Sequence, residues 1–305
     1  MNLQQRRFLF ITGKGGVGKT TVAAAIASAE AARGRRVLIA LSEAKERLST
    51  LFGVAPLGAE IRGVAPGISA VRIDPERALS EYGRMVLKSR HLHRAVFESK
   101  VVTGFFRGIP GLSEWSVLGK AWYHSTEQLP DGRPRFDLVL FDAPATGHGV
   151  EMLRVPKLIV DVIPPGILRR DAERAWELFR DPEKSGVVVV TLAEEMPATE
   201  TRELASSIRE DLGLPIAALV VNALWPPLFD PNQRRRLLER PLALPGENAA
   251  MEAIAAAVRR AAREEVQAQA LERLAAIEAP RVSLPLLLKN AATPAAVRAL
   301  SAHFQ

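Results

Sequence analysis

The residues best suited to chemistry lie in one glycine-rich stretch near the start of the chain. Residues 13–20 read GKGGVGKT and fit the phosphate-loop pattern G-x-x-x-x-G-K-[ST]. Glycines let backbone N–H groups turn inward around phosphate oxygens, and we expect Lys19 to reach the β- and γ-phosphates of a nucleotide. The Thr20 hydroxyl is the Mg²⁺ ligand of such a loop. Lys14 is a second lysine, which an ordinary phosphate loop does not require.

The segments on either side of the loop have the strand and helix patterns that flank a phosphate loop. An apolar, strand-like run precedes it at Phe8–Thr12, and an alanine-rich run at Thr21–Ala32 predicts a helix that ends at Gly34. The amino terminus of that helix adds partial positive charge beside bound phosphates. The sequence therefore predicts nucleotide binding by Gly13, Lys14, Gly15, Gly16, Val17, Gly18, Lys19, Thr20 and Thr21.

Further apolar runs predict the sheet that must hold this loop. Strands are expected at Arg36–Leu41, Ile68–Ile73, Phe136–Phe141, Val187–Leu192, Ile216–Val221 and Val282–Leu284. Most are near-continuous, which is typical of strands covered on both faces, and helical patterns lie between most of them. This alternation predicts an α/β fold with a doubly wound, mostly parallel sheet flanked by helices. We expect one domain over residues 1–305, with helical inserts near 78–122 and 157–184 and an amphipathic covering helix at Ala249–Ile277.

Two polar residues follow predicted strands. Asp142 comes directly after Phe136–Phe141, and its carboxylate is expected to hold Mg²⁺ through water, together with Thr20. Asn222 comes directly after Ile216–Val221 and could hydrogen-bond the edge of an adenine. Ligands of doubly wound sheets bind at the carboxyl ends of strands, which favours both roles. The alternative for each is an ordinary polar residue at a strand end.

Together these motifs resemble those of the arsenite-pump and tail-anchored-protein-targeting ATPases, in the signal-recognition/MinD class of P-loop NTPases. The stretch Gly13–Thr21 is similar to the deviant Walker A of that class. Other segments similar to family motifs are Arg72–Glu76, Pro110–Glu114, Phe141–His148, Glu151–Pro156 and Val220–Asn222. The phosphate loop occurs once in this chain, whereas arsenite-pump ATPases carry two copies, so the chain resembles the single-copy members that dimerise.

The resemblance implies ATP and Mg²⁺ as cofactors and a dimer in which Lys14 reaches the phosphates of the ATP bound by the partner. It implies that His148 senses the γ-phosphate and that Pro285 covers the adenine on its other side. Glu43 stands where the family has the aspartate of a D-P-A-H switch, whose proline and histidine are missing here. Slow or partner-dependent hydrolysis is therefore expected. The alternatives are a capped turn for His148 and a plain surface helix for Glu43.

Composition limits the partners. The 305 residues carry a net charge of +7, which permits contact with nucleic acid or an anionic membrane, but no recognition motif accompanies it. The chain has no cysteine, so disulfides, thiolate metal sites and cysteine nucleophiles are excluded. Arsenite export and the zinc-bridged dimer of the targeting members, which the resemblance associates with thiolates, are disfavoured. With no signal peptide and no apolar run of membrane-spanning length, we expect a cytoplasmic protein.

Three hypotheses for the function remain. The first is an ATP-hydrolysing dimeric switch that acts on a protein partner, for which the apolar stretch Phe105, Phe106 and Trp115 could form a client surface or buried packing. The second is a MinD/ParA-like spatial-organising ATPase, which docks on a membrane or on DNA. The tail at Thr293–Gln305 predicts a helix that either docks on the fold or touches a membrane. The third is a weakly active regulatory subunit that forms a heterodimer with a related ATPase.

Overall fold

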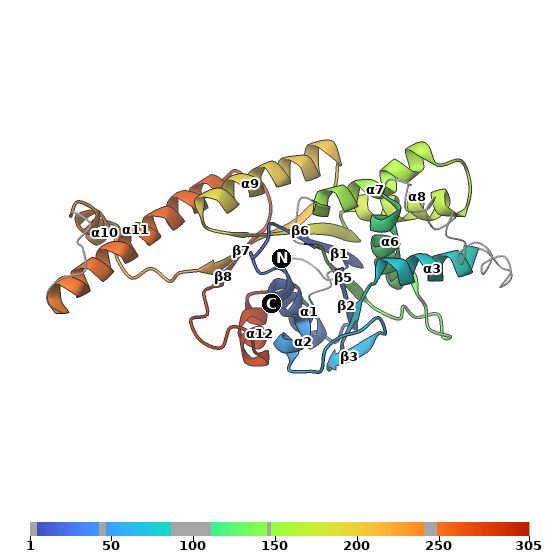
Figure 1. Cartoon of the computed structure of the whole chain (residues 1–305), viewed down its shortest axis with the longest axis horizontal. Coiled ribbons are helices and arrows are strands. Elements are labelled where there is room, and N and C mark those ends of the chain that lie inside the picture. Colours follow the sequence, from blue (N-terminus) through green and yellow to red (C-terminus); the bar gives the residue numbers. More distant parts are fainter. Residues whose placement is uncertain (1–4, 43–46, 87–110, 145–147, 241–248, 305) are drawn as a thin grey trace.

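A computed structural model describes residues 5–42, 47–86, 111–144, 148–240 and 249–304. Its centre is one eight-stranded sheet in the order β3-β4-β2-β5-β1-β6-β7-β8 (Figure 1). All neighbouring strands pair in parallel except β3 and β4. The strands are β1 Phe8–Thr12, β2 Val37–Leu41, β3 Arg62–Ala65, β4 Ile68–Arg72, β5 Leu138–Asp142, β6 Ser185–Leu192, β7 Ile216–Leu224 and β8 Arg281–Pro285. The predicted doubly wound, mostly parallel α/β fold is confirmed.

The near-continuous apolar strands arise because both faces of the sheet are buried. In β1, Phe8 and Phe10 face one core, while Leu9 and Ile11 face the other. All four side chains are at most 1% exposed. Since side chains alternate between the two faces of a strand, a strand buried on both sides must be apolar at every position.

Helices cover each face of the sheet (Figure 1). On one face lie α1 Lys19–Ala32, α2 Leu48–Phe52 and α12 Pro294–Ser301, which contact one another. On the other face lie α3 Pro75–Val86, α6 Leu112–Thr126, α7 His148–Val162, α8 Ile167–Arg180, α9 Glu195–Ser206 and α11 Ala249–Ala275. The short α10 Pro231–Leu238, a π-helical turn at Ser207–Asp211 and a 3-10 turn at Ala302–Phe304 complete the described helical elements. The described parts of the inserts near 78–122 and 157–184 consist mainly of α3, α6, α7 and α8, with non-helical turns at residues 163–166 and 181–184.

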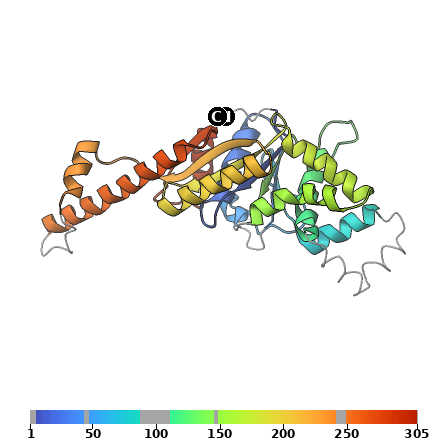
Figure 2. The same cartoon turned by 90° about the horizontal axis from the view of Figure 1, so that it is seen from above.

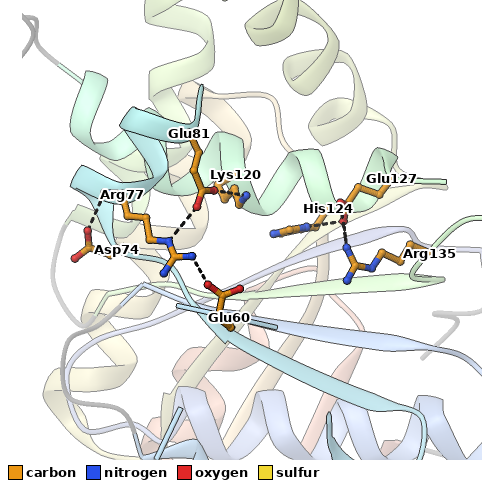
Figure 3. Close-up of polar contacts among 8 residues, drawn as sticks. All are labelled: Glu60, Asp74, Arg77, Glu81, Lys120, His124, Glu127 and Arg135. Atoms are coloured by element: carbon orange, nitrogen blue, oxygen red, sulfur yellow. Dashed lines mark hydrogen bonds and ion pairs between the residues drawn. The ribbon is translucent and has the colours of Figure 1, made fainter. Parts of the chain in front are cut away.

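Ion pairs anchor α3 at the side of the fold that carries these inserts (Figure 3). Arg77 contacts Glu60, which precedes β3, and donates to Glu81 at 3.0 Å. Lys120 on α6 completes the chain of contacts with a 2.6 Å bond to Glu81. Trp115, also on α6, is 2% exposed, so it packs in the core, whereas Phe105 and Phe106 lie outside the described residues.

The prediction of a covering helix at Ala249–Ile277 is only partly right. The carboxyl-terminal part of α11 packs on the core through Ala270 and Leu274, which are at most 1% exposed. Its amino-terminal part extends beyond the sheet with α10 beside it (Figures 1 and 2), and there Met251 is 46% exposed. The two helices form an arm that covers no strand over this length.

The carboxyl-terminal tail docks on the fold. Thr293 caps α12 by accepting from the N–H of Ala296 at 3.3 Å. Val297, Leu300 and Phe304 are at most 3% exposed and belong to the core beside α1. The apolar side chains of this helix are therefore buried within the protein, as the docked alternative predicts, and are not presented to a membrane.

Candidate nucleotide site

The phosphate loop lies at the carboxyl end of β1, between its neighbours β5 and β6. The loop ends at Gly18, whose φ of +93° is a left-handed conformation that favours glycine, and α1 begins at Lys19. Lys19 is 7% exposed, and its Nζ donates to the carbonyls of Gly13 at 3.2 Å and Lys14 at 3.1 Å. The lysine is thus held over the loop, at the amino terminus of the helix.

Two loop glycines sit where a side chain would collide. A Cβ on Gly13 (φ +149°) would lie 2.2 Å from the backbone oxygen of Val190 in β6. A Cβ on Gly18 would lie 2.2 Å from Nδ2 of Asn222 in β7. The loop therefore passes directly over the carboxyl end of β6, and at Gly18 it lies against the Asn222 side chain that reaches it from β7. Such a backbone concavity fits a phosphate group.

Thr20 and Asp142 form a hydrogen bond beside the phosphate loop. The Thr20 hydroxyl donates to Oδ2 of Asp142 at 2.6 Å, and Asp142 is 6% exposed at the last residue of β5. Ser42, just beyond β2, donates to the Asp142 carbonyl at 2.9 Å. A hydroxyl and a carboxylate oxygen are hard donors of the kind that Mg²⁺ prefers, so this donor set fits the predicted metal. Nowhere in the described ranges, this site included, do three or more His, Asp or Glu side chains form a cluster that could hold a metal ion.

A cavity of about 660 Å³ opens over these residues. Its walls combine the phosphate loop with two further segments. Arg47, Thr50 and Leu51 come from α2 and the residue before it, and Ala291 and Ala292 come from the connection between β8 and α12, which the sequence did not suggest. Glu43, the predicted water-orienting residue, lies outside the described residues.

The two predicted adenine contacts take different positions. Asn222 lies within β7, not after it, and its Nδ2 donates to the Val17 carbonyl at 2.9 Å, so its amide ties the strand to the phosphate loop. Pro285 ends β8 and lines a separate cavity of about 470 Å³ with Trp225 and His303. The structure therefore brings Asn222 to the loop and does not bring Pro285 to the phosphate cavity. An adenine contact remains a prediction for both.

Helix α7 approaches the phosphate loop through a glycine that the sequence reasoning missed. His148 is the first residue of α7, and its side chain lies outside what the structure describes. A Cβ on the following residue, Gly149, would lie 2.6 Å from Oγ1 of Thr12 at the end of β1. Gly149 thus lets the first turn of α7 contact the strand that carries the loop. Its only sequence signal was its position beside the second-switch motif.

Lys14 forms an ion pair that the sequence did not indicate. Its Nζ lies 2.9 Å from Oε1 of Glu200 on α9, and the two side chains are 47% and 28% exposed. The second lysine of the loop is therefore held by its own chain at the rim of the site. No local motif marks Glu200.

Comparison with known proteins gives a consistent picture. The sequence profile of the anion-transporting ATPases matches residues 6–164. The chain is 30% identical to the ATPase BagA of Mycobacterium tuberculosis over 301 residues, covering 92% of this chain and 87% of that protein. It is 28% identical to an arsenical pump-driving ATPase of Escherichia coli over 237 residues, covering 72% of this chain and 40% of that protein. It is 25% identical to ATPase GET3 of Kluyveromyces lactis, covering 72% of each.

Proposed function

The chain belongs to the anion-transporting ATPase family, and we propose that it works as a Mg²⁺-dependent, ATP-hydrolysing dimeric switch acting on a protein partner. The observation that carries this proposal is the meeting of Lys19, Thr20 and Asp142 around one cavity beneath a glycine loop. Membership of the family supports nucleotide binding and ATPase activity in general. The metal, the dimer and the partner are the finer parts of the proposal.

The residues of the glycine loop and the start of α1 are best suited to binding phosphate. Loop N–H groups and the start of α1 would receive the phosphates, and Lys19 would exchange the Gly13 and Lys14 carbonyls for phosphate oxygens. A charged donor gains more from a phosphate oxygen than from a neutral carbonyl, so this exchange favours the bound state. Thr20 and Asp142 would hold Mg²⁺, which neutralises charge that develops on the transferred phosphoryl group. The orientation of the attacking water by Glu43 stays a prediction.

The dimer is supported by Lys14, which its own site does not need. It stands at the rim of the loop, 47% exposed, while Lys19 already occupies the centre. An exposed cation at this place can neutralise the phosphates of a nucleotide bound by a second subunit, in the manner of an arginine finger. ATP then favours association, because a ligand shifts an equilibrium toward the state that it binds more tightly.

The test compares two lysine variants in one sizing experiment with ATP and Mg²⁺. Lys19→Ala should lower ATP affinity at least tenfold, because a charge-assisted bond is worth about 1.5–3 kcal/mol. Lys14→Ala should retain most of the ATP affinity but lose ATP-dependent dimerisation and turnover. Wild-type protein with ADP should stay monomeric. A Lys14→Ala protein that hydrolyses ATP normally as a monomer would refute the dimeric mechanism.

The metal and the partner need separate measurements. Asp142→Asn should raise the Mg²⁺ concentration needed for half-maximal turnover, because a neutral amide is a weaker Mg²⁺ ligand than a carboxylate. ATP-dependent sedimentation with liposomes or DNA would instead favour the spatial-organising alternative. The burial of Val297, Leu300 and Phe304 supports the protein-partner proposal over a membrane-docking tail. Turnover that appears only with a related ATPase would favour the regulatory-subunit alternative.

A further inference from the structure

The ion pair between Lys14 and Glu200 joins the second lysine of the phosphate loop to α9, a helix that contributes no residue to the lining of the phosphate cavity. We propose that Glu200 is a positioning residue, which holds Lys14 on its own protomer in the absence of a dimer. When two copies of the chain associate with ATP, Lys14 leaves Glu200 and contacts the nucleotide of the second copy. This inference rests on the dimeric function proposed above. On this inference, α9 opposes dimerisation through Glu200 until ATP is bound.

The fold delivers Lys14 to Glu200 through the strand order. Gly13 passes over the backbone oxygen of Val190 in β6, and α9 follows β6 directly in the chain. The residue after Gly13 therefore comes to lie beside the first turns of α9. The approach depends on the absence of a side chain at Gly13, because its Cβ would meet the Val190 oxygen at 2.2 Å.

The carboxylate of Glu200 projects from a helix that is fixed to the sheet. Thr201 on α9 donates its hydroxyl to Thr191 Oγ1 of β6 at 2.8 Å. Thr201 and Ala198, which flank Glu200 on the same helix, are 3% and 0% exposed. The backbone of α9 at Glu200 is thus anchored by its neighbours, and Lys14 rather than Glu200 is the member of the pair that can leave.

The Lys14–Glu200 ion pair is exposed enough to break at little cost in free energy. Because both side chains reach solvent, the pair should bias an equilibrium only about two- to fivefold. A polyphosphate carries more negative charge than one carboxylate, so it can displace Glu200 from Lys14. In a symmetric dimer two such pairs open at once, and the two effects multiply. The net restraint on dimerisation should then be about four- to twenty-fivefold.

The matched variants are Glu200→Gln and Glu203→Gln. Both remove one negative charge from α9, but Glu203 is exposed and makes no ion pair within the described part of the chain. With ATP and Mg²⁺, analytical ultracentrifugation of Glu200→Gln should give a dimer Kd about four- to twenty-fivefold tighter than wild type. Glu203→Gln should match wild type. The advantage of Glu200→Gln should shrink in 1 M NaCl, because salt screens an exposed pair.

Lys14→Ala and the double variant Lys14→Ala/Glu200→Gln complete a cycle. If Glu200 acts through Lys14, the second substitution should change nothing once the lysine is gone. A Glu200→Gln dimer no tighter than wild type, or a gain that persists without Lys14, would overturn the inference. If Lys14→Ala itself dimerises as wild type does, the dimeric function proposed above fails, which is a different result. Equal unfolding midpoints of Glu200→Gln and wild type would confirm that the effect does not arise from misfolding.

Discussion

Replacing Gly13 by alanine tests the contact between the phosphate loop and β6. The added Cβ would lie 2.2 Å from the Val190 oxygen, whereas ordinary contacts begin near 3.4 Å, so loop and strand must separate by about 1 Å. Val190 cannot yield easily, because β6 is paired with β1 on one side and β7 on the other. The φ of +149° adds a backbone cost of about 1–3 kcal/mol for any residue with a side chain. Together these effects should lower the free energy of unfolding by about 3 kcal/mol.

The control variant is Gly34→Ala, at the carboxyl end of α1. Gly34 also has a positive φ, +84°, but a Cβ there would meet nothing within 4 Å. Its cost should be the backbone strain alone, about 1 kcal/mol. Urea unfolding without nucleotide, followed by circular dichroism, measures both variants against wild type. Comparing them separates the steric clash from the conformational strain.

ATP binding provides the second readout for the same pair of variants. Gly13→Ala should lower ATP affinity at least tenfold, because a shift of about 1 Å moves the N–H groups of the loop out of register with the phosphates. Gly34→Ala should bind ATP as wild type does. If Gly13→Ala matches Gly34→Ala in both stability and ATP affinity, the contact with Val190 does not constrain the loop and the reasoning is wrong.

Three further predictions concern the frame around the site. Glu264→Gln should lower the free energy of unfolding by about 2 kcal/mol, because this 3%-exposed carboxylate accepts from two backbone N–H groups and from Arg260. The control is Glu265→Gln, at a 38%-exposed side chain, which should change the free energy of unfolding by less than about 0.5 kcal/mol. Hydrogen bonds from Arg36 hold the pKa of Asp137 below its ordinary value, so their stabilisation is present above about pH 4 and is lost as the pH falls further. The stability difference between wild type and Asp137→Asn, measured by urea unfolding, should therefore be largest near pH 7 and shrink toward pH 3; a difference that does not change with pH would contradict it. Leu300→Ala should cost about 3 kcal/mol in thermal or urea unfolding, since this side chain is 3% exposed in the core beside α1, and a loss under 1 kcal/mol would show that α12 is not docked.

The fold could be predicted largely because the strands are apolar on both faces. Phe8–Thr12 was predicted with the bounds that β1 has, and the other parallel strands differ at one or both ends. β3 was not predicted, because Arg62–Ala65 is short and its first two residues are exposed, so no apolar pattern marks it. The outer part of α11 was predicted to cover the sheet because an amphipathic pattern indicates that a helix packs, without indicating on what.

The site could be predicted only where a local spacing defines it. Lys19, Thr20 and Asp142 were predicted because a phosphate loop and an acidic residue at a strand end are contiguous patterns. The hydrogen bond from Asn222 to Val17, by contrast, depends on two segments that are distant in sequence. So does the contact of Gly149 with Thr12, which a single glycine in a switch motif does not reveal.

By itself, the sequence determined that this chain has a phosphate loop with two lysines, on a doubly wound sheet of ATPase type. Hydrophobic periodicity and the phosphate-loop motif are patterns among residues that are close in sequence. These features can therefore be predicted from the sequence alone. Only the tertiary structure decided where Lys14 goes. Because β6 lies beside β1, the helix that follows β6 places Glu200 next to the loop, 2.9 Å from the lysine. Strand order brings these two residues together, and no local pattern encodes strand order.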